Sequence, residues 1–343
     1  MARQPALPAL RNVAADGLEP RFAHSAEVDF GRLLTYYGIR WVYEPTTFAL
    51  AWGPDGRPTE CFTPDFYLPD QGLYIELTTM RQRLVTRKNR KVRRLRAIYP
   101  NVRVKLLYRR DCLRLQESYP APMSGASPKT TVDGTSSVAA VSRCRLGPVL
   151  LAEAAIRRRV GELAAVLASE LLEVVGNGGE LPVVLTLGGG ARRFQADLIE
   201  RLLGRGVGIE PERIELSRYR MRGGMRRVRV RRPPRQAVAG RRVLVVVDVV
   251  STGLSLSYLE RWLRRRGAVG VEVCALLDRR SARLVDMPVR HVGFEAPADL
   301  LVGYGLPLHR RFRSLPFIAT VEVDPTPAAG AEFLADNGTG LNR

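Results

Sequence analysis

The first hundred residues alternate between helical and strand-like patterns of apolar positions. Apolar residues recur at helical spacing over residues 25–37 and 84–98, and short apolar runs lie between and after these segments. Turn residues separate the runs, as in Gly53-Pro54-Asp55-Gly56. The pattern predicts helices over 25–37 and 84–98, and strands over 40–43, 47–52, 61–68, 73–77 and 102–108.

The C-terminal half shows longer continuous apolar runs that alternate with helical patterns. The predicted order is a helix over 151–174, a strand over 181–187, a helix to residue 203, a strand over 242–247, a helix over 256–266 and a strand over 271–277. Continuous apolar strands alternating with helices indicate a parallel sheet covered on both faces. Such sheets bind ligands at the carboxyl ends of their strands.

A segment rich in Ser, Thr, Pro, Gly and Ala separates these two patterns, and it is typical of a flexible linker. The chain therefore divides into an N-terminal extension over 1–22, a first domain over 23–110, a linker over 111–146, a second domain over 147–323 and a tail over 324–343.

Composition excludes several classes of protein. The 343 residues are 45% hydrophobic and 26% charged, which excludes wholesale disorder. The longest apolar run, 243–250, is interrupted by Asp248, so we expect no membrane span, and without a secretory signal pattern we expect the cytoplasm. The four cysteines lie far apart, which disfavours disulfides and zinc sites.

The net charge of +20 favours a polyanionic partner. The alternative is compositional bias, because the basic residues are nearly all arginine. The segments 81–96 and 218–235 each hold nine basic residues and no acid, and such clustering indicates phosphate contact. We therefore expect nucleic acid to bind along the predicted helix 84–98.

The clearest local motif is VLVVVDVVSTGLS, residues 243–255, where a buried strand enters a Ser/Thr/Gly loop and then a helix. Backbone amides of such a loop and of the helix N-terminus form an anion cradle, and the hydroxyls of Thr252 and Ser255 add donors. Asp248, at the strand end, would face sugar hydroxyls or a metal. The alternative makes Ser255 an ordinary helix N-cap.

Residues 181–320 resemble the hypoxanthine-guanine phosphoribosyltransferase family, which has the type I phosphoribosyltransferase fold. The resemblance lies in VLVVVDVVSTGLSLSYLERWL, VCALLDRR and MPVRHVGFEAPADLLVGYGLPLHRRFRSLPFI. It implies that phosphoribosyl pyrophosphate or a nucleotide binds here, with residues 217–236 as a mobile lid. The implied contacts are Ser251, Thr252, Gly253, Leu254 and Ser255 for the 5-phosphate, Asp248 for the ribose, Arg279, Leu300 and Leu301 for the base, and Gly188, Gly189 and Arg313 for pyrophosphate.

Several positions depart from the family pattern. Val247 replaces the first of two paired acids, and Ser251 replaces the acid proposed to assist at the base nitrogen. Leu300 replaces a stacking aromatic, Pro307 replaces an acid that supports metal and pyrophosphate, and glycine replaces the lysine of the pyrophosphate loop at 188–189. Because a serine cannot act as a carboxylate base near neutral pH, the departures favour binding of a phosphorylated ribose over efficient purine salvage.

Three acids of the first domain lie on otherwise apolar elements: Glu27, Asp65 and Glu76. Buried acids are costly unless they are paired or bind cations, and three converging carboxylates suit Mg²⁺ (or Mn²⁺) and phosphodiester hydrolysis. The alternative pairs each acid separately with an arginine.

Residues 24–108 resemble the PD-(D/E)xK nuclease superfamily, through TPDFYLP followed by YIEL. The resemblance implies a metal held by Glu27, Asp65 and Glu76. Thr78 stands where the superfamily has its lysine, and Lys88 is the nearest substitute, ahead of Lys91 and Lys105. The alternative is an inactive domain that grips nucleic acid through helix 84–98.

Two hypotheses follow for a cytoplasmic, homo-oligomeric α/β protein in which a small restriction-endonuclease-like domain precedes a parallel-sheet type I phosphoribosyltransferase-like domain. The first is a purine-type phosphoribosyltransferase with an accessory nuclease-like domain. The second is a ligand sensor whose weakened transferase domain controls nucleic-acid binding or cleavage by the N-terminal domain.

Overall fold

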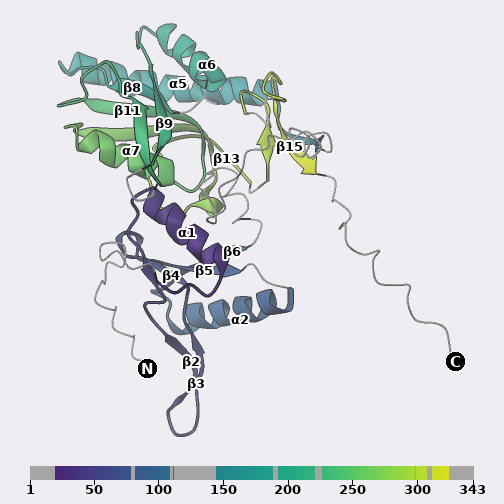
Figure 1. Cartoon of the computed structure of the whole chain (residues 1–343). Coiled ribbons are helices and arrows are strands. Elements are labelled where there is room, and N and C mark those ends of the chain that lie inside the picture. Colours follow the sequence, from purple (N-terminus) through teal and green to yellow (C-terminus); the bar gives the residue numbers. More distant parts are fainter. Residues whose placement is uncertain are drawn as a thin grey trace, which may run out of the picture.

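The computed structural model describes residues 20–78, 82–108, 111, 144–187, 192–220, 226–297, 299–306 and 311–323. Two sets of elements lie one above the other, and we refer to residues 20–108 as the N-terminal part and to residues 144–323 as the C-terminal part (Figure 1).

The N-terminal part is a mixed sheet flanked by two helices. Its sheet has the order β1-β4-β5-β6, in which β5 and β6 are parallel and the other pairs are antiparallel. The hairpin β2–β3 projects away from the rest of the molecule (Figure 1). The elements are α1 (Ser25–Tyr36), β1 (Val42–Tyr43), β2 (Phe48–Trp52), β3 (Pro58–Phe62), β4 (Phe66–Leu68), the 3-10 helix η1 (Pro69–Gln71), β5 (Leu73–Thr78), α2 (Gln82–Ile98) and β6 (Arg103–Tyr108).

The predicted order of helix, strands, helix and strand is confirmed, with two corrections. The strand predicted over 61–68 is two strands, β3 and β4, which belong to different sheets. Pro64 lies between them and has no N–H to donate to a sheet ladder. Phe22, which we placed in the extension, packs its ring against Trp41 and Tyr43, so this core begins earlier than predicted.

The C-terminal part is a six-stranded sheet of order β10-β9-β8-β11-β12-β13 with a smaller antiparallel sheet, β14-β15-β7, beside it. All neighbours in the large sheet are parallel except β9 and β10. The elements are β7 (Cys144–Leu151), α5 (Glu153–Gly176), β8 (Val183–Leu187), α6 (Arg192–Leu203), β9 (Glu212–Arg220), β10 (Arg226–Arg232), β11 (Arg242–Val250), α7 (Leu254–Arg264), β12 (Gly270–Asp278), the 3-10 helix η2 (Arg280–Ala282), β13 (His291–Glu295), β14 (Leu301–Val302) and β15 (Ile318–Val323).

Successive residues of β11 pack on opposite faces of this sheet. Val243 and Val245 contact the apolar side of α7, whereas Leu244 and Val246 pack with α5 and α6. Side chains alternate in this way along any strand, so a strand covered on both faces is apolar throughout. The prediction of a parallel sheet with helices on both faces is confirmed.

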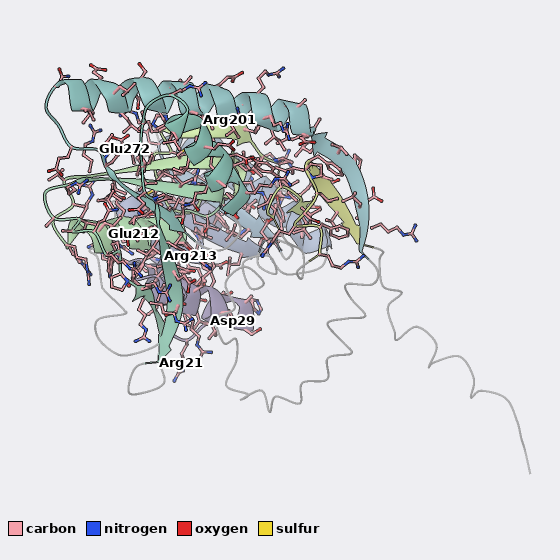
Figure 2. The ribbon with its side chains drawn as sticks, turned by 90° about the horizontal axis from the view of Figure 1, so that it is seen from above. Arg21, Asp29, Arg201, Glu212, Arg213 and Glu272 are labelled. Carbon is pink, nitrogen blue, oxygen red and sulfur yellow. The ribbon has the colours of Figure 1, made fainter. Side chains whose placement is uncertain are left out.

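Some elements differ from the predicted pattern. The predicted linker ends inside β7, because residues 144–146 pair with β15, and the helix predicted from residue 151 begins at Glu153. The hairpin β9–β10 was not predicted, because its arginines hide the alternation of apolar positions. The base of the hairpin, where β9 joins β8, is held at Glu212 (labelled in Figure 2), whose carboxylate accepts the N–H groups of Arg235 (2.5 Å) and Gln236 (2.8 Å).

One apolar cluster is shared by the two parts. Leu34, Phe66 and Ile75 of the N-terminal part pack with a set of buried residues of the C-terminal part. That set comprises Val228, Leu254, Leu284 and Val285. Among the described helices, none is both long enough and apolar enough to span a membrane.

Candidate functional sites at the phosphate loop and the acid cluster

The loop 251–255 connects the carboxyl end of β11 to the first turn of α7. Gly253 is the N-cap of α7 and has a φ of +81°, so Ser255 lies at the second helical position. The alternative that Ser255 is an ordinary N-cap is therefore wrong. The first turn of a helix leaves its backbone N–H groups without helical acceptors, and Ser255 presents its hydroxyl beside them.

The loop is held rigidly from the side of residues 284 and 285. The carbonyl of Thr252 accepts the N–H groups of Leu284 (2.9 Å) and Val285 (3.1 Å), and its hydroxyl accepts the N–H of Leu254 at 3.4 Å. A Cβ at Gly253 would lie 2.6 Å from the carbonyl oxygen of Val285. Thr252 and Gly253 therefore fix the shape of the loop.

The two positions of the family's acid pair differ in environment. Asp248 is partly buried, its carboxylate accepts the N–H of Val249 at 2.8 Å, and burial raises its pKa. Val247 is 3% exposed and packs in the apolar cluster beneath α7. The strand end therefore presents one carboxylate, as the sequence indicated.

The predicted base-contacting residues come together. Arg279 donates its backbone N–H to Val250 (2.8 Å), and its guanidinium donates to the carbonyl of Asp299 (2.7 Å). Leu301 is buried in the small sheet, and Leu300 is exposed. Arg279 thus lies against the segment that carries both leucines.

The pyrophosphate residues are described in part. Arg313 lies in an exposed turn whose position is fixed from two sides. Its carbonyl accepts the N–H of Gly305 at 3.0 Å, and Arg193 of α6 donates to the carbonyl of Leu315 at 3.1 Å. This brings the turn against the first turn of α6. Gly188, Gly189 and Pro307 lie outside the described residues.

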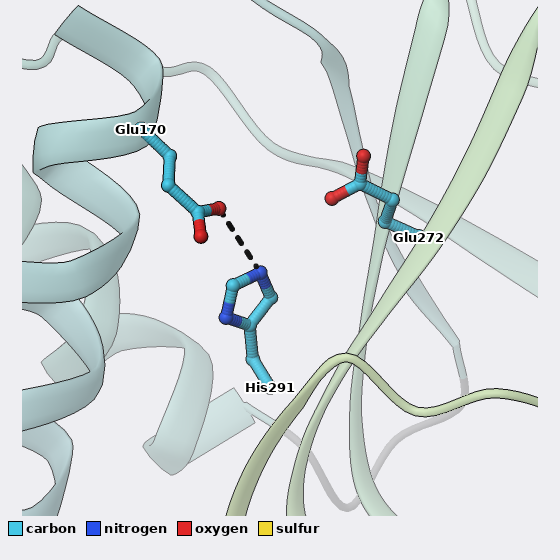
Figure 3. Close-up of side chains that lie close together, drawn as sticks. All are labelled: Glu170, Glu272 and His291. Atoms are coloured by element: carbon cyan, nitrogen blue, oxygen red, sulfur yellow. Dashed lines mark ion pairs between the residues drawn. The ribbon is translucent and has the colours of Figure 1, made fainter. Parts of the chain in front are cut away.

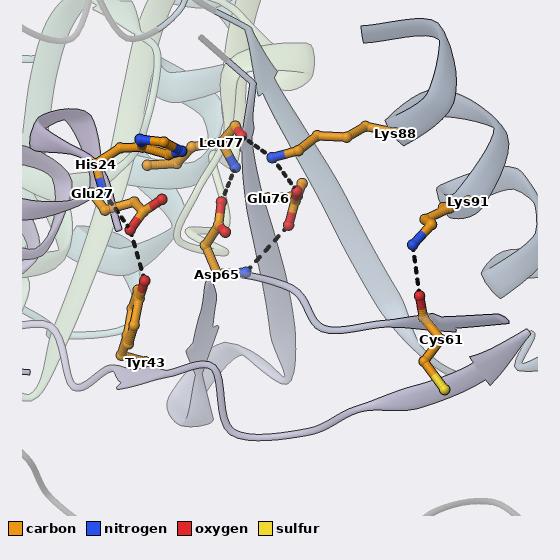
Figure 4. A network of polar contacts seen from close by, with 9 residues as sticks. All are labelled: His24, Glu27, Tyr43, Cys61, Asp65, Glu76, Leu77, Lys88 and Lys91. Carbon is orange, nitrogen blue, oxygen red and sulfur yellow. Dashed lines mark hydrogen bonds and ion pairs between the residues drawn. The ribbon is translucent and has the colours of Figure 1, made fainter. Parts of the chain in front are cut away.

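The structure brings the three predicted acids of the N-terminal part to one place (Figure 4). Glu27, on the first turn of α1, accepts the N–H of Ala23 at 2.9 Å and the hydroxyl of Tyr43 at 2.7 Å. Asp65 accepts the N–H of Leu77 at 2.6 Å, and its own N–H donates to Glu76 at 3.3 Å. All three acids are buried, and within the described residues none of them forms an ion pair with an arginine, so the alternative of separate arginine pairs is wrong for this cluster.

The three candidate lysines have different partners in the structure. Lys88 of α2 places Nζ 2.5 Å from Oε1 of Glu76 and donates to the carbonyl of Leu77 at 2.8 Å (Figure 4). Lys91 donates to the carbonyl of Cys61 instead, and Lys105 donates to carbonyls of the C-terminal part. Thr78 is buried beside the cluster, at the end of β5.

Burial shifts the ionisation of the clustered acids. Burial raises the pKa of Asp65 to about 6, despite the N–H of Leu77 and the charge of Lys88. Burial and the charge of Asp65 raise the pKa of Glu76 to about 7, although Lys88 opposes the shift. A divalent cation would stabilise both carboxylates in their charged form. Carboxylate oxygens suit Mg²⁺ or Mn²⁺ by type, but among the described residues only Glu170, Glu272 and His291 bring three ligand atoms within 4.8 Å of one another, so the three acids offer suitable donors without that close grouping.

Glu44 is an exposed acid beside this cluster that the sequence did not reveal. Its N–H donates to the carbonyl of Asp65 at 2.9 Å, and its negative charge helps to raise the pKa of Asp65. Its φ of +43° is unusual for a residue other than glycine, and strained residues of this kind gather at functional sites. The one signal in the sequence was a glutamate before a proline.

A third group of polar side chains, drawn in Figure 3, lies near the amino ends of β12 and β13, whereas the phosphate loop follows the carboxyl end of β11. Nε2 of His291 lies 3.4 Å from Glu170, and Glu272 is close to both. Arg290 pairs with Glu170 (3.1 Å) and with Glu272 (3.6 Å), and Arg242 pairs with Glu272. Glu170, Glu272, Arg242 and Arg290 border a cavity of about 260 Å³. Because arginines already neutralise both carboxylates, the group is an ion-pair network.

Comparisons with known proteins show which proteins the C-terminal part is similar to. A family model for the phosphoribosyl transferase domain matches residues 152–299. The chain is 33% identical over 175 residues to hypoxanthine-guanine phosphoribosyltransferase of Bacillus subtilis, which covers 51% of this chain and 92% of that protein. It is 32% identical over 176 residues to hypoxanthine phosphoribosyltransferase of Salmonella typhimurium, covering 50% of this chain and 94% of that protein. A crystal structure of a hypoxanthine-guanine phosphoribosyltransferase from Bacillus anthracis aligns with 52% of this chain and 99% of that chain, at 27% identity and a TM-score of 0.44.

Proposed function

Because this chain belongs, through its C-terminal part, to the hypoxanthine-guanine phosphoribosyltransferase family, we propose that the loop 251–255 binds the phosphate of phosphoribosyl pyrophosphate or of a nucleoside monophosphate. The observation that carries the proposal is the loop itself. Its conformation is fixed at Thr252 and Gly253, and it opens directly into α7, so the first-turn amides of α7 and the hydroxyl of Ser255 belong to one short segment that an anion would contact. Asp248 is the carboxylate of the strand end that would face the ribose hydroxyls and a Mg²⁺ held by the ligand.

The experiment that tests this proposal is calorimetric titration of the full chain with phosphoribosyl pyrophosphate. We expect Ser255→Ala to weaken binding about ten-fold, since a hydrogen bond to a charged group contributes about 1.5 kcal/mol or more. Ser257→Ala, two positions further along α7, is the matched control and is expected to bind like the wild type. Absence of binding by the wild type would contradict the proposal.

We further propose that purine transfer by this site is slow. The family's acid at the head of the loop is replaced by Ser251, and loss of a positioned general base costs about two to four orders of magnitude in rate. Ser251→Asp is expected to raise the rate of purine nucleotide formation by at least ten-fold, measured with hypoxanthine or guanine. Rapid wild-type turnover, or a variant no faster than the wild type, would show that Ser251 does not limit the reaction.

A second candidate function concerns the acid cluster of the N-terminal part, and one observation favours it. Lys88, from α2, reaches Glu76 at 2.5 Å and so supplies the cation that Thr78 cannot. We propose that Glu27, Asp65 and Glu76 hold Mg²⁺ or Mn²⁺ for phosphodiester hydrolysis. The metal, when bound, would polarise the phosphate and lower the pKa of a water, and Lys88 would orient that water.

The basic face of α2 supports a nucleic-acid substrate for this cluster. Val92 and Leu95 are buried under the helix, whereas Arg87, Arg90 and Arg93 are exposed on its outer side. Outward arginines on the helix that also carries Lys88 would contact phosphates close to the acid cluster. Binding through such contacts weakens steeply with added salt.

The sensor hypothesis unites these two functions, and α1 gives it a physical basis. This helix of 12 residues, about 18 Å long, carries Glu27 on its first turn and ends beside Tyr37 at the phosphate loop. A ligand at one end and a metal at the other would therefore act on the same rigid element. Transfer remains the primary proposal, because family membership supports it.

A further inference from the structure

The projecting hairpin β2–β3 carries an exposed aromatic ring. Trp52, the last residue of β2, is 44% exposed, and it is the only aromatic residue with an exposed side chain among those whose side chains the structure describes. The other two tryptophans are covered, since Trp41 is buried and the ring centroid of Trp262 lies 3.6 Å from Cζ of Arg266. Isolated apolar residues are common on protein surfaces. Trp52 differs from them in the basic side chains beside it.

Trp52 lies on the face of the hairpin that packs against α2. Side chains alternate along a strand, so Phe48, Leu50 and Trp52 share one face of β2. Phe48 and Leu50 are buried in an apolar cluster that includes Val92 and Leu95 of α2. The face that is covered by α2 at its inner end is therefore open to solvent at its outer end, where Trp52 lies.

Two arginines of α2 reach the same face. Glu60 of β3 pairs with Arg94 at 2.5 Å and with Arg90 at 3.8 Å, and both arginine side chains are still about half exposed, at 46% and 61%. Two residues beyond Glu60 along β3, Pro58 lies opposite Trp52. The outer end of the hairpin thus places an indole ring next to two guanidinium groups that solvent can reach.

The turn beyond Trp52 is closed by its own hydrogen bonds. The N–H of Gly53 donates to the carbonyl of Arg57 at 2.9 Å, and the N–H of Gly56 donates to the carbonyl of Gly53 at 3.0 Å. The carboxylate of Asp55 accepts the N–H of Arg57 at 3.1 Å. An aromatic ring beside such a closed turn has little backbone freedom to lose when it binds a partner.

We propose that Trp52 stacks on a base of single-stranded nucleic acid whose phosphates contact Arg90 and Arg94. This inference rests on the nucleic-acid substrate proposed for the acid cluster. Every base has an aromatic face, so stacking on an aromatic side chain tolerates any sequence but requires an unstacked, unpaired base. The segment 81–96 holds nine basic residues and no acid, which favours a polyanion over a protein as the occupant of this face.

The test compares single-stranded oligothymidylate with the same strand paired to oligoadenylate, by fluorescence anisotropy of the full chain in EDTA, which prevents cleavage. Trp52→Ala is expected to bind the single strand about ten-fold more weakly and the duplex like the wild type, because the paired bases cannot stack on the ring. Trp52→Phe keeps a smaller ring and should fall between the two. Thr59→Ala, at an exposed position of β3, is the matched control and should bind like the wild type.

Two further measurements separate the ring from the charges. Binding of the single strand should quench the tryptophan fluorescence of the wild type but not that of Trp52→Ala, because Trp41 and Trp262 are covered. Arg94→Ala should weaken binding of both the single strand and the duplex and reduce the salt dependence, because phosphates are common to the two ligands.

Unchanged affinity of Trp52→Ala for the single strand, with a wild type that binds it, would overturn the role of Trp52 and leave the nucleic-acid proposal standing. Equal losses for the single strand and the duplex would mean that the substitution disturbs the hairpin in general, and they would also overturn base stacking. A wild type that binds neither ligand at low salt would overturn both proposals.

Discussion

Asp65→Asn is expected to stabilise the protein at pH 8 and to remove its response to Mg²⁺ or Mn²⁺. In the folded protein the pKa of Asp65 is raised to about 6 and that of Glu76 to about 7, in each case first by burial. The folded state then binds more protons than the unfolded state between about pH 4 and pH 7, so wild-type stability falls as the pH rises through this range. Each pKa unit corresponds to about 1.4 kcal/mol, so the ionised pair opposes folding by a few kcal/mol at pH 8.

Asparagine at position 65 keeps an acceptor for the N–H of Leu77 and removes one of the two neighbouring charges. Thermal unfolding between pH 4 and pH 8 should therefore show a variant that is more stable at pH 8 and equal to the wild type near pH 4. Mn²⁺ should raise the melting temperature of the wild type but not that of Asp65→Asn. Asp55→Asn, at an exposed turn, is the control.

The same variant tests cleavage of nucleic acid. Asp65→Asn should abolish metal-dependent cleavage while leaving binding through α2 intact, and Lys88→Ala should impair cleavage more than Lys91→Ala on the same helix. Stabilisation of Asp65→Asn by Mn²⁺ equal to that of the wild type would place the metal elsewhere.

Gly253→Ala is expected to destabilise the protein by about 3 kcal/mol or more, well beyond the effect of an ordinary loop substitution. Two costs combine at this position. The φ of +81° is unfavourable for any residue with a Cβ, and that Cβ would lie 2.6 Å from the carbonyl oxygen of Val285. The backbone of residues 284 and 285 cannot retreat without breaking its two hydrogen bonds to Thr252.

Gly56→Ala isolates the first of these costs. Gly56 has a φ of +74°, but no atom lies within 4 Å of the position that its Cβ would take, so the substitution should cost only about 1 kcal/mol. Denaturant unfolding of both variants measures the difference. Equal losses would show that the loop yields to the added carbon. For the same reason, a bulky substitution at Gly253 cannot serve as a clean probe of phosphate binding, whereas Ser255→Ala can.

Much of the fold followed from periodicity, because the strands of the large sheet are buried on both faces and read as continuous apolar runs. β11 and β12 were predicted to within a few residues for this reason. The hairpin β9–β10 was missed, because arginine fills its exposed positions and obscures the two-residue repeat. β7 was missed because its exposed apolar residues, such as Val149, face solvent beside a polar segment.

The candidate sites divided along a similar line. Spacing along one strand and one loop was enough to single out Asp248 and residues 251–255, because the whole constellation is local in sequence. The acids of the N-terminal part were named from separate elements, but their contacts are non-local. The sequence ranked Lys88 first only by its nearness, and Glu44 carried no signal beyond its place before Pro45, since its position beside Asp65 depends on how distant elements pack.

The apolar cluster shared by the two parts restricts how far the sequence of either part can change independently of the other. Two modules joined only by a tether can be exchanged independently, since each closes its own core. Here side chains of the N-terminal part cover four residues of the C-terminal part, namely Val228, Leu254, Leu284 and Val285. Leu254 belongs to the phosphate loop itself. A transplanted C-terminal part would expose these positions to water, and a substitute N-terminal part would have to match them in shape. We therefore expect proteins that carry both parts to keep them together, with compensating substitutions on the two sides of this apolar cluster.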